Sequence, residues 1–247
     1  MPVKSRSKDT RNLKGKIALV TGANRGIGLA IAHALTAAGC EVVITGRDEK
    51  TLTKAERELR RYKVRVLSVV CDVRDSHDVD VLATEIKKKF GRLDILINNA
   101  GIIQPNLKIE EMPLEVWRDV IDINLTGTFI VTKAILPLMK RGGIIVNNLS
   151  IVVKQTFTGT AAYNASKQGA LAFTNTLREE LREKEIRVLA LIPGAVDTDI
   201  WNTLWAEAPR HKMMSAETVA KALLNALLLP ENSAIDELTI MPSVGAL

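Results

Sequence analysis

From Ile17 onward, the sequence alternates short apolar runs with longer stretches in which apolar residues recur at helical spacing. The short runs show no alternation of polar and apolar residues, which is typical of strands in a parallel sheet with helices on both faces. We therefore predict one doubly wound α/β domain with a sheet of about seven strands. The predicted strands are Ile17–Val20, Glu41–Thr45, Val64–Val70, Ile95–Asn98, Ile144–Asn147, Arg187–Ile192 and Leu238–Met241.

The composition agrees with one globular domain and argues against several other classes. The chain has 247 residues, of which 47% are hydrophobic, and this fraction is far above that of a disordered protein. It has no uninterrupted apolar run of about 18 residues, the length that a membrane-spanning helix requires. Two cysteines cannot form a disulfide framework in a chain of this length. We expect a cytoplasmic protein without a membrane partner.

The positive charge is concentrated at the N-terminus. Residues 1–16 contain six Lys or Arg and one Asp, so they carry +5 of the formal net charge of +6. We predict a basic, flexible leader over residues 1–12 and one folded domain over residues 13–247. The leader lacks the apolar core of a secretory signal. A nucleic-acid-binding arm is the alternative, but the leader lacks interleaved aromatic residues, so we expect no nucleic-acid partner.

A glycine-rich segment, Thr21–Gly28, joins the first predicted strand to the first predicted helix. Gly22 permits a tight turn, Gly26 lets backbone amides approach a pyrophosphate, and Gly28 allows the helix to pack closely on the strand. The helix N-terminus then presents unpaired N–H groups to the anion. The segment predicts a dinucleotide site, and a glycine-rich turn without a ligand is the alternative. We assign cofactor contacts to Gly22, Asn24, Arg25, Gly26, Ile27 and Gly28.

The end of the second predicted strand indicates which dinucleotide binds. An NAD site would place Asp or Glu there to accept a hydrogen bond from the ribose 2′-hydroxyl. Here the strand runs into Gly46 and Arg47, and Asp48 lies beyond them at a predicted helix cap. The guanidinium of Arg47 can pair with a 2′-phosphate, and Arg25 adds a second positive charge. Two cations without an acid predict NADP(H); the alternative is that both arginines are solvated surface groups.

Ser150, Tyr163 and Lys167 form the candidate catalytic set. Tyr163 and Lys167 are four residues apart and therefore share one face of a predicted helix. We expect the neighbouring ammonium to lower the pKa of the phenol, so that Tyr163 can protonate an alkoxide or accept a proton from an alcohol. Lys167 would also reach the cofactor ribose. Ser150, which follows the predicted strand Ile144–Asn147, would hold the substrate oxygen by a hydrogen bond.

With these motifs in this order, the chain resembles the short-chain dehydrogenase/reductase family from about Leu13 to Met241. The resemblance implies that Asp72 and Val73 contact the adenine. It also implies that Asn124 supports a proton-relay water near the lysine. The segment Pro193–Thr198 matches the family pattern in which a valine and a threonine contact the nicotinamide carboxamide. Further cofactor contacts implied by the resemblance are Asn99, Ala100, Gly101, Tyr163, Lys167, Pro193, Gly194, Val196 and Thr198.

The resemblance also implies a Rossmann-type sheet with the strand order 3-2-1-4-5-6-7. The implied activity is NADP(H)-dependent oxidoreduction that interconverts a carbonyl and an alcohol. A homo-oligomer, either a tetramer or a dimer, would form through helices near Trp117–Leu136 and Ala162–Arg182. The alternative function is a catalytically silent NADP(H)-sensing or scaffold protein. The intact Ser-Tyr-Lys set argues against it, because a sensor does not need the acid.

Two departures from the family pattern bear on the substrate. Ile151–Gln155 follows Ser150 where many members have a glycine, so the pocket wall that includes Val152 should be bulkier. The C-terminal segment Ile235–Pro242 lacks the Asp-Gly-Gly of many 3-oxoacyl carrier-protein reductases. It is more similar to the branch of small hydroxy-acid dehydrogenases. The substrate therefore stays open between a 3-oxoacyl compound and a small hydroxy acid or carbonyl compound.

A short substrate-facing segment is predicted over residues 198–215. Trp201, Leu204 and Trp205 lie at i, i+3 and i+4, so they would form one apolar helix face, either over a substrate or packed on the body or on a neighbouring subunit. We assign Val152, Trp201 and Trp205 to the substrate pocket. The run Pro209–Lys212 would attract an acidic substrate or a carrier protein, or lie in a solvated loop. The three His and two Cys show no metal-ligand spacing, so we expect no metal site.

Overall fold

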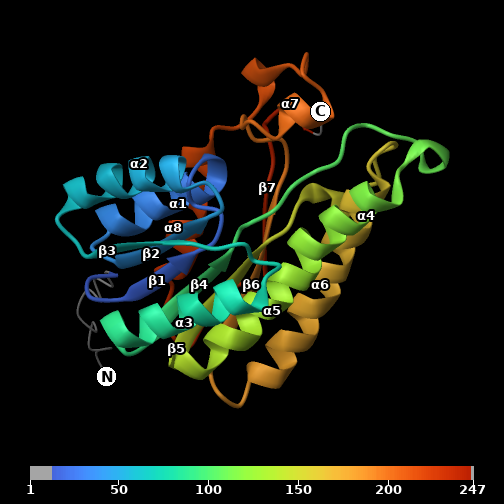
Figure 1. Cartoon of the computed structure of the whole chain (residues 1–247). Helices are drawn as coiled ribbons and strands as arrows, with labels where there is room; N and C mark the ends of the chain where they lie inside the picture. The colour runs from blue at the N-terminus through green and yellow to red at the C-terminus, as the bar shows by residue number, and fades with distance from the viewer. Residues whose placement is uncertain (1–12, 246–247) are drawn as a thin grey trace, which may run out of the picture.

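Every pairing in the sheet is parallel, and the seven strands are arranged in the order β3-β2-β1-β4-β5-β6-β7 (Figure 1). The predicted fold class and strand order are thus confirmed. The computed structural model describes residues 13–245, so the predicted leader over residues 1–12 lies outside the described residues. The strands are β1 (Ile17–Val20), β2 (Glu41–Gly46), β3 (Val66–Val70), β4 (Leu93–Asn98), β5 (Met139–Asn148), β6 (Arg187–Pro193) and β7 (Glu237–Ile240).

The bounds of two strands differ clearly from the prediction. β5 begins at Met139 instead of Ile144, because a shift of register beside Leu93 lets Met139 pair with Leu93. Gly142 has a φ of 82° within this irregular part, a conformation that glycine adopts easily. β3 begins at Val66 instead of Val64, because a 3-10 turn and a left-handed Lys63 precede it.

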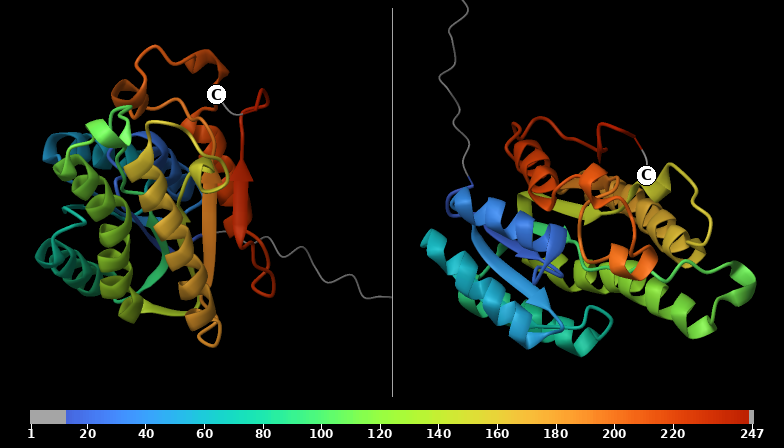
Figure 2. Two further views of the ribbon diagram at one scale, coloured as in Figure 1. Left: turned by 90° about the vertical axis from the view of Figure 1, so that its right-hand side faces the viewer. Right: turned by 90° about the horizontal axis from the view of Figure 1, so that it is seen from above.

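Helices cover both faces of the sheet. α1, α2 and α8 lie on one face, and α3, α5 and α6 lie on the other (Figures 1 and 2). The α-helices are α1 (Gly26–Ala37), α2 (Glu49–Leu59), α3 (Ser76–Phe90), α4 (Leu114–Ile121), α5 (Gly127–Ile135), α6 (Ala161–Leu181), α7 (Trp201–Leu204) and α8 (Ala216–Leu227). A π-helical turn, η3 (Asp122–Thr126), joins α4 to α5, and short 3-10 turns include η5 (Ile151–Val153) and η6 (Arg210–Lys212).

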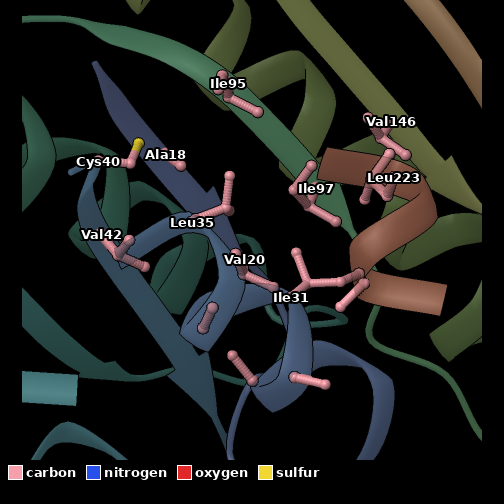
Figure 3. Close-up of a cluster of buried hydrophobic side chains, with 14 of the residues drawn as sticks. Ala18, Val20, Ile31, Leu35, Cys40, Val42, Ile95, Ile97, Val146 and Leu223 are labelled. Carbon is pink, nitrogen blue, oxygen red and sulfur yellow. The ribbon is translucent and has the colours of Figure 1, made fainter. Parts of the chain in front are cut away.

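The packing of β1 explains why the predicted strands show no alternation. Ala18 and Val20 point into the core beneath α1 and α8, while Ile17 and Leu19 point into the core on the opposite face. All four side chains are buried. Figure 3 shows Ala18 and Val20 in the first of these cores. Since both faces of the strand are dry, every position along it is apolar.

Among residues 13–245, one helical stretch, Leu114–Leu138, is long and apolar enough to cross a membrane by length and composition alone, and 39% of its apolar 18-residue window is buried. A core helix of a globular domain meets the same criterion. In the fold, this stretch contains α4, η3 and α5, and its buried residues Val131 and Ile135 pack in the core beneath the sheet. The stretch is therefore explained by the α/β architecture.

Candidate active site

A cleft of about 1130 Å³ opens at the carboxyl ends of the strands, where doubly wound sheets bind their ligands. Residues that follow each of the seven strands line it. The structure brings nearly all the predicted site residues to this cleft, including Ser150, Tyr163 and Lys167. Two predicted residues, Gly28 and Asn124, lie outside its lining.

The glycine loop after β1 is braced by the loop after β4. Gly22 has a φ of 62°, and a Cβ atom added there would lie 2.9 Å from the Cα of Ala100. The side-chain Nδ2 of Asn99 donates hydrogen bonds to the backbone oxygens of Thr21 (2.9 Å) and Gly22 (3.1 Å). A Cβ added to Gly28 would collide with this same amide. Gly22 and Gly28 thus permit the close approach of the two loops.

The N-terminus of α1 differs from those of α2, α3 and α8. Arg25 is its N-cap residue, and no side chain caps the helix. By contrast, the side chains of Asp48, Asp75 and Ser215 accept hydrogen bonds from the first turns of α2, α3 and α8. The first turn of α1 contains no acidic residue. Its N–H groups and the helix dipole therefore suit an anionic ligand in the cleft.

Arg47 lies at the rim of the cleft, directly after β2. The nearest carboxylate in contact with its guanidinium is that of Asp72, at 4.0 Å. Asp72 is held more closely by Arg74, at 2.7 Å, and this hydrogen bond lowers the pKa of the Asp72 carboxyl. Arg47 therefore keeps an exposed guanidinium facing the cleft, and 55% of its side chain is accessible to solvent.

The side chain of Ser150 lies beside the Tyr163 phenol, and its interaction with the phenol acts to lower the pKa of Tyr163. Ser150 belongs to the extended chain after β5, and Tyr163 lies in the first turn of α6. Burial raises the pKa of the Tyr163 phenol, and the interaction with Ser150 only partly opposes this effect. The expectation of a net lowered pKa for Tyr163 is therefore wrong for the structure as it stands, because desolvation of the phenolate dominates.

Lys167 lies one turn after Tyr163, and its side chain is buried. Its Nζ donates a hydrogen bond to the backbone oxygen of Asn148, at 2.8 Å. Burial lowers the pKa of the ammonium to about 8. The lysine is thus anchored to the end of β5, in the lining of the cleft.

Asn124 lies in the π-helical turn between α4 and α5, and its side chain is fully engaged. Its Oδ1 accepts a hydrogen bond from the backbone N–H of Ile102 (2.8 Å), and its Nδ2 donates to the oxygen of Ile102 (2.9 Å) and to Ser166 Oγ (3.0 Å). These bonds tie the loop after β4 to α6, the helix that contains Tyr163 and Lys167. The proton-relay role of Asn124 stays a prediction.

The substrate-facing segment differs from the predicted amphipathic helix. α7 ends at Leu204, and Trp205 has extended backbone angles, so the three apolar residues do not form one helix face. The indole N–H of Trp201 donates to the backbone oxygen of Val196 (2.9 Å), which fixes this side chain, whereas Trp205 is 46% exposed. Trp201, Leu204, Trp205 and Val152 nevertheless all line the cleft. Figure 2 shows α7 and its flanking loops standing over the ends of the strands.

Arg210 holds this segment together. Its guanidinium donates hydrogen bonds to Asp197 Oδ1 (2.8 Å), the backbone oxygen of Thr198 (2.7 Å) and Asn202 Oδ1 (2.7 Å). The sequence predicts that the basic run Pro209–Lys212 attracts an acidic substrate or a carrier protein, or is a solvated loop. Arg210 instead binds the segment to the chain after β6 by hydrogen bonds, so its guanidinium is not free to attract a substrate.

The sequence model of the short chain dehydrogenase family matches residues 16–209. The chain belongs to this family. Its similarity to individual oxidoreductases extends over nearly the whole chain. The chain is therefore an oxidoreductase of this family.

Among proteins similar to this short-chain dehydrogenase is an uncharacterized oxidoreductase of Staphylococcus saprophyticus, 35% identical over 93% of this chain and 98% of the relative. A 3-oxoacyl-[acyl-carrier-protein] reductase of Synechocystis is 40% identical over 79% of this chain and 80% of the relative. A metagenomic short-chain oxidoreductase, solved in complex with NADP, is 30% identical with a TM-score of 0.81, over 94% of this chain and 98% of that one.

Sequence reasoning missed several residues of this short-chain dehydrogenase that the fold brings to the cleft. Ile102 and Ile103 follow the Asn-Asn-Ala-Gly motif, Phe157 precedes α6, and Met241 follows β7. Their apolar character alone carries no positional signal, because core residues look the same. Within residues 13–245, no group of three or more His, Cys, Asp or Glu side chains is arranged to hold a metal ion.

Proposed function

We propose that this short-chain dehydrogenase is an NADP(H)-dependent oxidoreductase that interconverts a carbonyl group and an alcohol at Ser150, Tyr163 and Lys167. The observation that carries the proposal is that Ser150, Tyr163 and Lys167 line one cleft together with the uncapped N-terminus of α1. A proton donor and a dinucleotide-binding loop therefore share one cavity.

The residues of the cleft fit NADP(H). The uncapped first turn of α1 offers N–H donors to the pyrophosphate, and the exposed guanidinium of Arg47 offers a partner for the 2′-phosphate. Arg25 also lines the cleft, where its guanidinium lies 3.6 Å from the carboxylate of Asp199. The NADP complex of the related metagenomic oxidoreductase supports this assignment. When bound, the cofactor supplies or accepts the hydride.

In the direction of reduction, Ser150 holds the carbonyl oxygen by a hydrogen bond and Tyr163 donates its phenolic proton to that oxygen. The raised pKa of Tyr163 keeps the phenol protonated at neutral pH, so the acid is in the form required for this step. The ammonium of Lys167 stabilises the phenolate that forms. In the direction of oxidation, the same groups act in reverse and Tyr163 accepts the proton of the alcohol.

The lining around Tyr163 favours a substrate with apolar substituents. Beyond Ser150 and Tyr163, the cleft walls are mostly uncharged and apolar, since they include Ile102, Ile103, Ile151, Val152, Phe157, Ile200, Trp201, Leu204 and Trp205. The cations Arg25 and Arg47 lie on the cofactor side, and Arg210 is engaged within the substrate-facing segment. We infer that apolar ketones and 3-oxoacyl thioesters are preferred over small hydroxy acids. The 40% identical 3-oxoacyl reductase supports the thioester arm.

The test is a turnover assay of the purified chain with NADPH or NADH. The panel contains an apolar ketone, a 3-oxoacyl thioester and a small 3-oxo acid, and the readout is loss of the reduced cofactor's absorbance. The proposal expects turnover with NADPH, best with the first two compounds. Binding of NADPH without turnover of any carbonyl compound would instead support the silent sensor.

We also propose a cytoplasmic homo-oligomer. The two cysteines, Cys40 and Cys71, are free and buried, as expected in a reducing compartment. Leu114, Trp117 and Phe129 expose apolar surface on α4 and α5, where the family resemblance implies a contact between subunits. Light scattering coupled to gel filtration tests this proposal: a mass of four or two chains supports it, and a mass of one chain contradicts it.

A further inference from the structure

The catalytic helix α6 lacks the usual side-chain cap at its N-terminus. Thr160 is the N-cap residue, but its hydroxyl donates to the backbone oxygen of Phe157 (2.8 Å) and contacts Asn164 Oδ1 (3.1 Å) instead of capping the first turn. The backbone N–H groups of this turn therefore need other partners. One of these groups is the N–H of Tyr163 itself.

Gln104, from the loop after β4, supplies that partner. Its Oε1 accepts a hydrogen bond from the backbone N–H of Tyr163 at 3.1 Å, and its Nε2 donates to the backbone oxygen of Gly159 at 3.3 Å. Only one orientation of the amide fits, because an N–H can only donate and a carbonyl oxygen can only accept. The side chain is 1% exposed, so solvent cannot replace either bond.

The segment that Gln104 holds is packed directly on its own loop. Gly159 has a φ of 75°, and a Cβ atom added there would collide with the side-chain oxygen of Asn106. The backbone oxygen of Gly159 also accepts from the N–H of Leu107 at 3.1 Å. Phe157 and Thr158, in the same segment, line the cleft. One buried amide thus connects the start of the catalytic helix to a wall of the substrate site.

We propose that Gln104 is a positioning residue. It fixes the position of the Tyr163 hydroxyl relative to Ser150, and it holds residues 157–160, which form part of the cleft wall, in place beside Tyr163. Gln104 acts through the backbone of Tyr163. A small displacement of the phenol costs catalysis because proton transfer requires hydrogen-bond distance to the substrate oxygen. The inference rests on the oxidoreductase activity proposed above, so its test includes a readout that is independent of turnover.

The first variant is Gln104→Met, which removes both hydrogen bonds at similar volume, with Gln155→Met as the matched control on the exposed side of the same region. We expect kcat to fall about tenfold or more in Gln104→Met. The Kd for NADPH should stay unchanged, because the glycine loop and Arg47 are untouched. An unchanged kcat in Gln104→Met would overturn the proposal.

The second variant, Gln104→Glu, separates positioning from simple loss of stability. A neutral carboxyl can accept from Tyr163 and donate its O–H to Gly159, whereas a carboxylate can only accept and faces the Gly159 oxygen with a negative charge. Burial raises the pKa of such a carboxyl into the range of about 5 to 8. We expect kcat of Gln104→Glu to approach that of the wild type at low pH and to fall as the carboxyl ionises. A kcat reduced equally at every pH would overturn the proposal.

Amide hydrogen exchange at Tyr163 gives the readout that needs no substrate. Gln104→Met should accelerate exchange in the peptide that contains Tyr163, and Gln155→Met should not. If the wild type turns over no carbonyl compound but this exchange is accelerated, the proposed function fails while the contact stands. If exchange is unchanged, Gln104 does not hold the helix start and the inference is wrong.

Discussion

The ammonium of Lys167 lies 5.6 Å from the centre of the Tyr163 ring. At this distance it interacts with the face of the ring, and its hydrogen bond goes to the backbone of Asn148 at 2.8 Å. Burial raises the pKa of the phenol and lowers the pKa of the ammonium to about 8. Burial of the charged Lys167 therefore lowers the free energy of unfolding, while the raised pKa of Tyr163 keeps the phenol protonated for the proposed proton transfer.

Replacement of Lys167 by Met should stabilise the cofactor-free protein at pH 7. A lysine with a pKa of about 8 in the folded state and 10.5 in its ordinary state costs the fold about 3 kcal/mol when charged. The lost hydrogen bond to Asn148 offsets about 1–2 kcal/mol of this gain.

The sign of the pH dependence follows from proton binding. Between about pH 8 and pH 10.5, the unfolded lysine holds a proton that the folded one has released, so wild-type stability rises relative to Lys167→Met. Denaturant unfolding of both proteins at several pH values measures this change. A difference in unfolding free energy that stays constant from pH 7 to pH 10 would show that Lys167 is not desolvated as described.

Arg47 should decide the cofactor preference. We predict that Arg47→Ala weakens NADPH binding by about 10- to 100-fold, because a charge-assisted hydrogen bond to the 2′-phosphate is lost, and leaves NADH binding unchanged. Arg61→Ala, an exposed arginine outside the cleft, is the control. Fluorescence titration with each cofactor measures the Kd. A clear preference for NADH that survives Arg47→Ala would refute the assignment of NADP(H).

Loosening of the substrate-facing segment should affect substrate binding. Arg210→Met removes three hydrogen bonds to Asp197, Thr198 and Asn202, so Trp201 and Leu204 lose their fixed position over the cleft. We predict a KM for the carbonyl substrate that rises about tenfold. Lys212→Met, in the same turn, controls for loss of a positive charge. Equal KM values for Arg210→Met and Lys212→Met would contradict the role of Arg210.

The fold and the main motifs could be predicted because their signals are local. β1 is apolar throughout since both of its faces are buried, so no alternation confuses the assignment. Gly22 and Gly26 have positive φ values, and the glycine spacing directly reports this backbone requirement. The spacing of Tyr163 and Lys167 likewise follows from one turn of helix.

The remaining features depend on contacts between distant parts of the chain. Gln104 meets Tyr163 across 59 positions of sequence, and no local pattern marks such a pair. The helix predicted through Trp205 ends at Leu204. Hydrogen bonds from Arg210 and from the Trp201 indole hold this segment against the chain after β6. The direction in which the pKa of Tyr163 shifts could not be predicted from the sequence either, because it depends on how deeply the phenol is buried and not on residue spacing.

The most direct test of the whole account is the kcat of Tyr163→Phe. The chain has two tyrosines, and Tyr62→Phe, at an exposed position, is the matched control. Removal of the general acid should lower kcat for carbonyl reduction by about 10²- to 10⁴-fold, with an unchanged Kd for NADPH. A loss of less than about tenfold in Tyr163→Phe, with NADPH binding intact, would contradict the proposed proton transfer and the function built on it.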